Sequence, residues 1–545
     1  MGFIWPRAGL ACTKDGAPAL WARTRKDVAV SGKLTDPALP AGAIIKVGED
    51  GDAIRNDGVY LRAANKNPWY VLATIYGEQE EGAPQYNRDK TLAAKNRRAW
   101  NLWACQDLTD EGRADRARKV GLKAADLAPL PDAEKAAAEW LEITELFQRR
   151  MGIGAEPPPN HESINFSETI FSRFLCFAQM VFEKNVDFAS ATFMSEASFI
   201  SAMFAGSADF RSATFMDRAY SRFATFTDRA DFRSAMFTDY ADFLSAVFTG
   251  DAAFRSAAFT GDAVFISATF TGDADFRSAT FTRYANFRSA KFVVDADFGS
   301  AMFTRYADFR SVTFTDDATF RSATFAGFAN FSSVMFTGPA NYSSAKFKAA
   351  TRFVDARFRK AVPQFHAAAL YDDTVFTLPD NYRKNWPPLK GDGVMPAADQ
   401  KRAYNRLRLF MNRSLQIDEE QFFHRQEMRC KMALADCPHR PFYWLYSGLS
   451  DFGISVVRPI VGICVVIAAG VVCMLCWQGA FSFTAAGWSI SNTLPFLGFG
   501  RLYYGADFAA HLPVWLKVLG GVQTIFSYTL LFFLGLGLRN RFRLR

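Results

Sequence analysis

An aromatic residue returns at alternating intervals of five and six residues through the middle of this chain, so the sequence has an eleven-residue period. The run begins at Phe166 and Phe171 and ends at Phe358. It has 36 positions, and only Ser221 and Tyr342 are not Phe. Most of these positions lie two residues after a small residue, usually Ala. A repeat this regular predicts a solenoid, because one repeat cannot bury its apolar face without a neighbour to stack on.

A helical arrangement of the same repeat is disfavoured. At about 100° per residue, positions 0, 5 and 11 would point near 0°, about 140° and about 20°, which splits the aromatic rings between two faces. The repeats are also rich in Asp, Ser, Thr and Gly, which are weak helix formers. Alternate side chains of an extended segment share a face, so each Ala-x-Phe triplet can direct its Ala and its Phe inward. The sequence therefore predicts short strands separated by polar turns.

Residues 208–212 read Ala-Asp-Phe-Arg-Ser, and residues 285–289 read Ala-Asn-Phe-Arg-Ser. This pattern resembles the pentapeptide-repeat family, in which Ala is followed by Asp or Asn, then by Leu or Phe, then by two variable residues. The resemblance covers 193 of the 545 residues and recurs dozens of times. It implies a mainly β fold, a right-handed four-sided β-helix with one repeat on each side. Every second repeat has a sixth residue, so one coil takes 22 residues, and nine coils span roughly 43 Å at about 4.8 Å per strand.

A spacing of 22 residues selects single columns of rings within this solenoid. Burying one Phe contributes about 1.5–3 kcal/mol, so such columns supply enough apolar core for the region. The column that we take as representative of the core consists of Phe210, Phe232, Phe254, Phe276 and Phe298.

One repeat departs from the pattern. Residues 219–223 read Ala-Tyr-Ser-Arg-Phe, so Ser221 stands in the aromatic position and Phe223 comes two residues late. We expect a bulge or a rearranged side at this point. A functional pocket is the alternative interpretation.

Outward positions form columns of opposite charge. We expect neighbouring Arg and Asp residues to pair along the solenoid, although an Arg stripe could also bind phosphate or an acidic partner. Between 166 and 358 there are 19 Lys and Arg against 20 Asp and Glu, a net charge of −1. Members of the family that imitate DNA are strongly acidic, so this neutral surface disfavours that activity, and we expect no nucleic-acid partner. The columns contain Arg211, Arg233, Arg255, Arg277 and Arg321 and, beside them, Asp209, Asp231, Asp275 and Asp297.

Two uncharged stretches near the C-terminus, residues 460–477 and 518–538, are long enough to cross a bilayer as helices. Basic residues are dense before the first stretch and after the second, and between them only Arg501 and Lys517 are basic. This asymmetry predicts a multi-pass membrane protein, in the bacterial inner membrane, with both termini and the solenoid in the cytoplasm. The lipid bilayer is therefore an expected partner through these two stretches.

The remaining sequence is divided by composition. A segment from Ala403 to Ala433 has apolar residues at helical spacing, and we expect it to pack on the solenoid end or to lie on the membrane surface. The expected organisation is a largely helical region (1–152), a linker (153–163), the β-solenoid (164–360), an irregular linker (361–398), amphipathic pre-membrane helices (399–457), a two-span transmembrane hairpin (458–540) and a basic tail (541–545).

The N-terminal region contains helical patterns over 91–105, 110–120 and 132–151 and a short β-like part before them. It also contains a group of aromatic residues, which we expect to form the core of this region, with a ligand site as the alternative. The group consists of Trp69, Tyr70, Trp100, Trp103 and Trp140.

Residues for catalysis or metal binding do not form a known motif. The five His belong to no paired-His or His-Glu arrangement. Cys430, Cys437 and His439, with His424 nearby, have a spacing that matches no standard zinc site. We therefore expect no enzymatic activity, no metal and no cofactor.

The connection between the two apolar stretches contains a segment, Leu494 to Gly500, that ends in Gly498-Phe499-Gly500. Two membrane helices that flank such a segment resemble the pore module of potassium channels, whose filter presents backbone carbonyls to the ion. Phe496 stands where that filter has Thr, and no Asp follows Gly500. The alternative interpretation is an ordinary external loop.

Two hypotheses follow. The first is a membrane-tethered, non-enzymatic scaffold whose solenoid surface binds a protein partner. The second is an ion-channel-like two-span protein with a cytoplasmic regulatory solenoid, which would act as a homo-oligomer.

Overall fold

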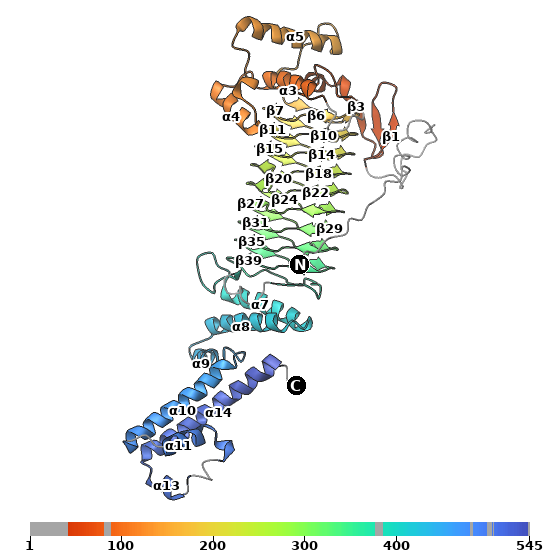
Figure 1. The fold of residues 1–545 in the computed structure, drawn as a ribbon. Helices are drawn as coiled ribbons and strands as arrows, with labels where there is room; N and C mark the ends of the chain where they lie inside the picture. The colour runs from red at the N-terminus through yellow and green to blue at the C-terminus, as the bar shows by residue number, and fades with distance from the viewer. Residues whose placement is uncertain are drawn as a thin grey trace, which may run out of the picture. The chain divides into compact units, whose positions relative to one another are not determined.

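A computed structural model describes residues 42–80, 89–376, 385–479, 483–498, 504 and 506–542. The chain divides into two compact units, Met1–Phe287 and Arg288–Arg545. The boundary falls inside the repeats, so each unit contains part of the solenoid (Figure 1).

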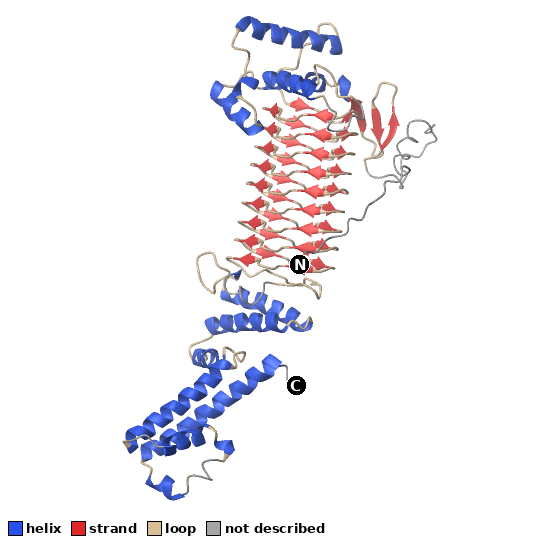
Figure 2. Cartoon of the chain, viewed as in Figure 1, coloured by secondary structure: helices blue, strands red, loops and turns tan. Residues whose placement is uncertain are grey.

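The repeats form a β-solenoid of about nine coils, as the sequence predicts. Almost every repeat contributes one strand of two residues, from β4 (Ile164–Asn165) to β39 (Arg357–Phe358). These strands belong to four parallel sheets, one for each side (Figure 2). Neighbours in a sheet are four strands apart in the chain, as in the pairing of Ala208 with Ala230 and of Asp209 with Asp231. The coil therefore takes 22 residues.

A tight turn after every second aromatic residue closes the coil. Ala213 donates its backbone N–H to the carbonyl of Phe210 at 3.1 Å, and Ser212 between them has a φ of 57°. A type II turn needs a positive φ at its third residue. The equivalent Ser of most coils has a φ between 53° and 60°. The Arg-Ser pairs of the sequence are therefore turn residues.

The rings of each column stack on one another along the solenoid. Phe210 and Phe232 have ring centroids 4.7 Å apart and planes inclined by 3°. Phe254 and Phe276 are 4.9 Å apart with an inclination of 2°. All five residues of the representative column, with Phe298 in the second unit, are at most 2% exposed. This spacing follows the separation of stacked strands, so the same aromatic residue fits in every coil.

The N-terminal region adds three strands to one of these sheets. They are antiparallel to one another, and β3 pairs in parallel with β5 (Thr169–Phe171). The buried guanidinium of Arg55 donates to the carbonyls of Ser190 and Ser212 at 3.3 and 3.2 Å, which fixes this small sheet along the solenoid. The added strands are β1 (Ile44–Val47), β2 (Ala53–Arg55) and β3 (Tyr60–Ala63).

Helix α3 covers the first coil. Its Trp100 packs among the first rings, 5.2 Å from Phe182, and donates its indole N–H to the carbonyl of Val181 at 2.9 Å. Asn101 donates to the carbonyl of Gln179 and accepts from the N–H of Val181. Trp100 and Tyr70 therefore pack on the first rings of the solenoid core, and Trp103 packs on Trp100. The helices are α2 (Pro68–Ala73), α3 (Lys90–Ala104), α4 (Asp110–Val120) and α5 (Ala133–Met151).

Two helices cover the last coil in the second unit. The helical pattern from Ala403 to Ala433 is interrupted in the structure, because the chain turns at Leu415, where φ is 57°. It forms α7 (Ala397–Arg413) and α8 (Ile417–Leu434), which pack against each other. Phe423 of α8 lies 5.1 Å from the ring of Trp386 and 5.9 Å from that of Phe376. Of the two places expected for this segment, it therefore takes the solenoid end.

The C-terminal part is helical. Helices α10 and α14 are the two described helices that are long and apolar enough to cross a membrane, and they contain the stretches predicted from sequence. Between them lies a shorter helix, α11, that packs against both. The elements of this part are α9 (Arg440–Ser450), α10 (Val457–Gln478), α11 (Phe483–Thr493), the 3₁₀ turn η5 (Pro495–Leu497), α13 (Ala506–His511) and α14 (Val514–Phe542).

Candidate functional site: the solenoid sides and the helical hairpin

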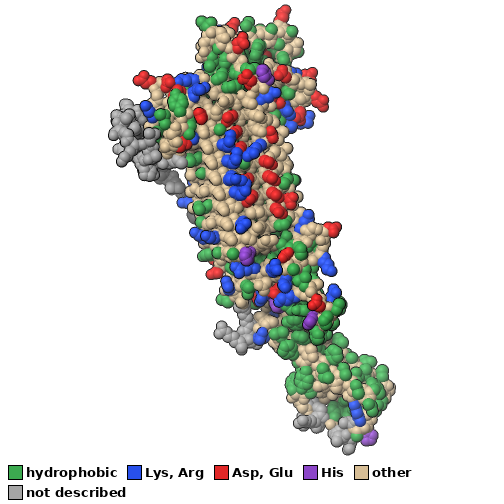
Figure 3. Space-filling view, turned by 180° about the vertical axis from the view of Figure 1, so that it is seen from behind, with side chains coloured by type: hydrophobic (Ala, Val, Ile, Leu, Met, Phe, Trp, Pro, Cys, Tyr) green, Lys and Arg blue, Asp and Glu red, His purple; other side chains and the backbone are tan. Residues whose placement is uncertain are grey.

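One side of the solenoid carries the predicted ladder of ion pairs. Arg233 and Asp231 are 2.6 Å apart, and Arg277 and Asp275 are 2.7 Å apart. Arg255 reaches Asp275 of the next coil at 3.0 Å. Burial works to raise the pKa of Asp231, but its bonds to Arg233 outweigh burial and lower it. Figure 3 shows basic and acidic side chains side by side along the solenoid, so charge is balanced locally.

The irregular repeat preserves the coil register. Ala219 pairs with Ala197 and Ala241 like any other repeat, so the expected bulge is wrong. Ser221 is buried in the aromatic position. Phe223 takes the turn position of Ser, with a φ of 57°, and its side chain is 52% exposed. A bulky residue at positive φ is strained, and a ring that is more than half exposed recovers little of this cost by packing.

A shallow cleft of about 390 Å³ lies next to this repeat. The rings of Tyr220 and Tyr240 are 6.3 Å apart, and the guanidinium of Arg222 lies 5.9 Å from the Tyr220 ring. Arg222 is held by the buried carboxylate of Asp242. Burial raises the pKa of Tyr240. The lining residues are Ile200, Arg218, Tyr220, Arg222, Asp239 and Tyr240.

Comparison with known families decides the nature of the repeats. Residues 254–302 match the family model of pentapeptide repeats, in nine copies. The solenoid is a pentapeptide-repeat β-helix. No curated protein and no solved structure matches the chain. This fold is commonly non-catalytic, and its chemistry lies in what its sides present.

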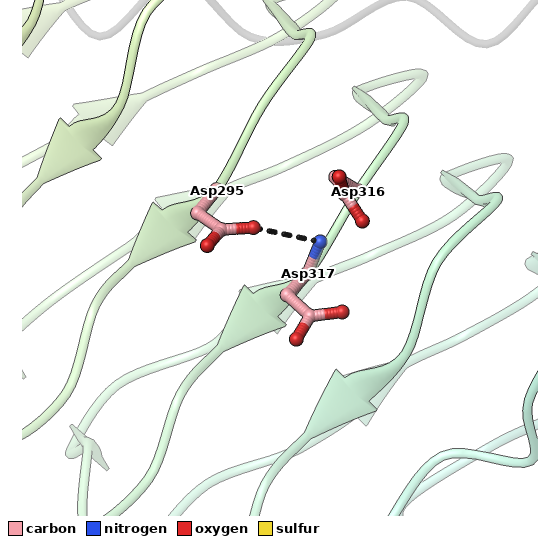
Figure 4. A group of neighbouring side chains, drawn as sticks. All are labelled: Asp295, Asp316 and Asp317. Atoms are coloured by element: carbon pink, nitrogen blue, oxygen red, sulfur yellow. Dashed lines mark hydrogen bonds between the residues drawn. The ribbon is translucent and has the colours of Figure 1, made fainter.

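Three exposed carboxylates meet on one corner of the pentapeptide-repeat solenoid (Figure 4). Asp295 accepts the backbone N–H of Asp317 in the next coil at 3.3 Å, and Asp316 adjoins them. Burial, together with Asp295 and Asp316, raises the pKa of Asp317. The same contact joins Asp251 to the N–H of Asp273 one coil apart at 3.2 Å. Coil stacking therefore explains this group, which we do not take as a metal site.

The Cys and His residues near α8 belong to no group with the spacing of metal ligands among the described residues. Within the described residues, the acidic group above is the only set with the spacing of metal ligands. Cys430 is buried and Cys437 is exposed. Burial raises the pKa of the Cys430 thiol to about 11, so it carries its proton at neutral pH.

The pore-like segment is described only in part. Gly498 follows η5 with a φ of 73°, a left-handed conformation that favours glycine. Phe499 and Gly500 lie outside the described residues. This motif therefore stays a prediction.

Helix α11 was not predicted from sequence, which gave a loop here. Ser489 donates to the carbonyl of Ile467 in α10 at 2.7 Å. Gln523 of α14 donates to Ser489 and Thr493 at 2.7 and 2.8 Å. A side chain at Gly470 would meet the Ser489 hydroxyl at 2.4 Å, so Gly permits this approach. The signal that could have indicated α11 is the i, i+4, i+8 spacing of Ala485, Ser489 and Thr493.

The interior of the helical part is therefore polar in places. Gln523 and Ser527 are buried, and their side-chain oxygens have no hydrogen-bond partner within the described residues. Trp488 is also buried, against Met474 and Leu516, and does not lie at the surface as expected for a loop. Polar residues inside apolar helices are common at functional sites of membrane proteins.

Proposed function

We propose that this chain is a membrane-tethered scaffold that binds a protein partner through a side of its pentapeptide-repeat solenoid. The cleft beside the irregular repeat carries this proposal. It is lined by Tyr and Arg side chains, and Arg222 in its lining is followed directly in the chain by the strained, exposed Phe223, where the repeat departs from its pattern. Tyr and Arg are enriched at the centres of protein interfaces. Glu196 and Asp242 hold the two Arg residues before any partner binds.

Both ends of the solenoid core are covered by other residues, which supports binding of a partner to the sides of the solenoid. In the first unit Trp100 of α3 closes the start of the core, and in the second unit Trp386 and Phe423 close its end. Closed ends leave the long faces for recognition. The two apolar helices supply the tether, and the positive charge next to them favours a cytoplasmic solenoid.

Site-specific photocrosslinking tests the proposal. The full chain would carry a photoreactive phenylalanine analogue at Phe223 or, as a control, at Arg277 on the ladder side, in native membranes. We expect one discrete protein adduct at Phe223 that Arg218→Ala with Tyr240→Ala removes, and none at Arg277. Inserted protein that gives no adduct at Phe223, or equal adducts at both positions, would contradict binding at this side.

A second candidate function is ion conduction. Helix α11 favours it, because a short helix packed between two membrane helices and followed by a glycine-containing turn is the arrangement of a pore module. Ion flux through liposomes that contain the full chain tests it. We expect Gly498→Val with Gly500→Val to abolish flux, whereas Gly535→Val, at an open position in α14, should preserve it. Absence of flux from the inserted natural sequence would exclude this candidate.

A further inference from the structure

Helix α9 has two different faces. On one face, Tyr446 stacks on Phe533 of α14 with ring centroids 5.5 Å apart and meets Phe452 edge-on at 5.7 Å. Arg458 at the start of α10 donates to the carbonyl of Ser447 at 2.6 Å. This face therefore fixes α9 against the ends of both apolar helices.

The opposite face of α9 is apolar and exposed. Phe442 and Trp444 are both 72% exposed, and Leu445 is 50% exposed. Residues 441–450 contain no charged side chain. At 100° per residue, these three residues fall on one side of the helix with Pro441 and Leu449. Isolated exposed apolar residues are ordinary on a protein surface, but a continuous apolar face needs a partner.

A hollow of about 660 Å³ runs along this face. Almost all of its surface is apolar, and the guanidinium of Arg440 stands at the first turn of the helix. An acyl chain is the kind of ligand that fits an apolar hollow with one cationic group at its end. The lining residues are Cys437, Arg440, Pro441, Trp444, Leu445, Gly448 and Leu449.

The surroundings of α9 indicate which partner covers it. Exposed apolar residues are also found on the first turns of α10, where Val457, Ile460 and Val461 are exposed. Basic residues gather at the same ends of the helices, with Arg458 in α10 and Arg539 in α14. Aromatic residues beside basic ones at the end of an apolar helix are typical of the bilayer interface.

We propose that α9 lies in the headgroup layer of the bilayer, with Phe442, Trp444 and Leu445 directed to the acyl chains. The hollow then holds a chain of an anionic phospholipid whose phosphate pairs with Arg440. This inference rests on the proposed membrane tether. It assigns the surface-lying role to α9 and not to the segment from Ala403 to Ala433, whose apolar residues cover the solenoid end. Helix α9 would thus set the depth at which the hairpin sits.

Photocrosslinking to lipid tests this assignment. The full chain, in vesicles of phosphatidylethanolamine and phosphatidylglycerol, would carry a photoreactive phenylalanine analogue at Leu445, at the inward Tyr446, at Val465 of α10 or at Phe223. We expect lipid adducts at Leu445 and Val465 and none at Tyr446 or Phe223. An adduct at Val465 without one at Leu445 overturns the proposal and keeps the tether. A protein adduct at Leu445 also overturns it.

The absence of an adduct at Val465 would instead contradict the tether, so the two failures are distinguishable. An adduct at Leu445 alone would keep α9 on the surface without spanning helices.

The phosphate contact has its own test. Arg440→Gln should reduce the preference of the Leu445 adduct for phosphatidylglycerol over phosphatidylethanolamine by about fivefold, the effect of one basic residue at an anionic surface. Arg402→Gln in α7 is the matched control, and an unchanged preference in Arg440→Gln would refute the contact.

Discussion

The solenoid and the helical hairpin place their polar and apolar side chains in opposite ways. In the solenoid, Phe254 is fully buried and the ion pairs face outward. In the hairpin, Val465 and Ile525 are 60% and 68% exposed, whereas Gln523 is 5% exposed. Figure 3 shows this as a largely hydrophobic surface over the C-terminal helices. If the hairpin lies in a bilayer, as proposed above, the two regions follow the same rule in different surroundings, because the outward apolar side chains of the hairpin then contact acyl chains.

The largest expected effect concerns the solenoid interior. Phe254→Ala should cost about 3–5 kcal/mol, because the cavity that it leaves is enclosed by stacked rings. Chemical unfolding followed with hydrogen exchange of the repeats would measure this cost. Phe223→Ser is the control, because it replaces an exposed ring by the residue that other coils have at this turn. Its expected effect is at most about 0.5 kcal/mol, and an equal loss from both variants would refute the inward assignment.

The next effect tests the solvent of the hairpin. Val465→Asp should reduce membrane insertion, since a carboxylate near the centre of a spanning helix costs about 2.5–3.5 kcal/mol. Alkaline extraction of membranes that contain the full chain would report the loss, with Val465→Leu as the control. If α10 were a helix in water, Asp at so exposed a position would change stability by less than about 0.5 kcal/mol. If Val465→Asp were retained in the membrane as well as the natural sequence, the hairpin would not differ from the solenoid in its surroundings.

A smaller effect is expected inside the hairpin. Gln523→Leu removes the bonds to Ser489 and Thr493 and should destabilise the hairpin by about 1–2 kcal/mol. Thermal unfolding of the full chain in detergent would measure this change. Thr529→Val is the matched control, because the Thr529 hydroxyl bonds only within α14 and lies on the exposed side. An unchanged stability to thermal unfolding in Gln523→Leu would mean that the polar contacts do not position α11.

The smallest effect concerns pH and the connection between the two regions. Burial, followed by the charge of Arg408, lowers the pKa of His424 in α8 below its ordinary 6.5. Glu427, Lys431 and the carbonyl of Phe452 also act on this ring. The unfolded chain therefore takes up the proton first, so stability is present above pH 6.5 and declines as pH falls through that value. The melting temperature should decline less between pH 8 and pH 5.5 in His424→Gln than in the natural sequence. If the melting temperatures of the two proteins declined equally with pH, the assignment of this loss of stability to His424 would be contradicted.

Sequence predicted what depends on spacing and local chemistry. The repeats are recognisable because one aromatic residue at intervals of five and six fits a single architecture. Helix α4 occupies the predicted residues because Thr109 accepts the N–H of Gly112 at its start and Gly121 adopts a left-handed conformation at its end. Signals of this kind act within a few residues, so they can be read without knowing the fold.

Features that depend on distant contacts were not predictable. Ser221 preserves the coil register because the strands on both sides of it fix the backbone, which no local pattern shows. Leu415 breaks a continuous amphipathic pattern because Phe422 and Phe423 must turn back to the solenoid end. Helix α11 is short and rich in Ser, Thr and Gly, and its contacts with α10 and α14 form only in the folded chain.

The 22-residue coil also constrains how the gene for such a chain can change in length. Insertion or loss of 22 codons at a turn adds or removes one complete coil and returns every later strand to its own sheet, as the pairing of Ala208 with Ala230 shows. A change of 11 codons preserves the aromatic rhythm but exchanges opposite sheets, so that strands of the Asp–Arg side would continue those of the Tyr220 side. Unequal recombination between repeats is thus tolerated only when it adds or removes a complete coil. A change of half a coil would place the Asp–Arg ion pairs and the residues of the cleft on the same side of the solenoid.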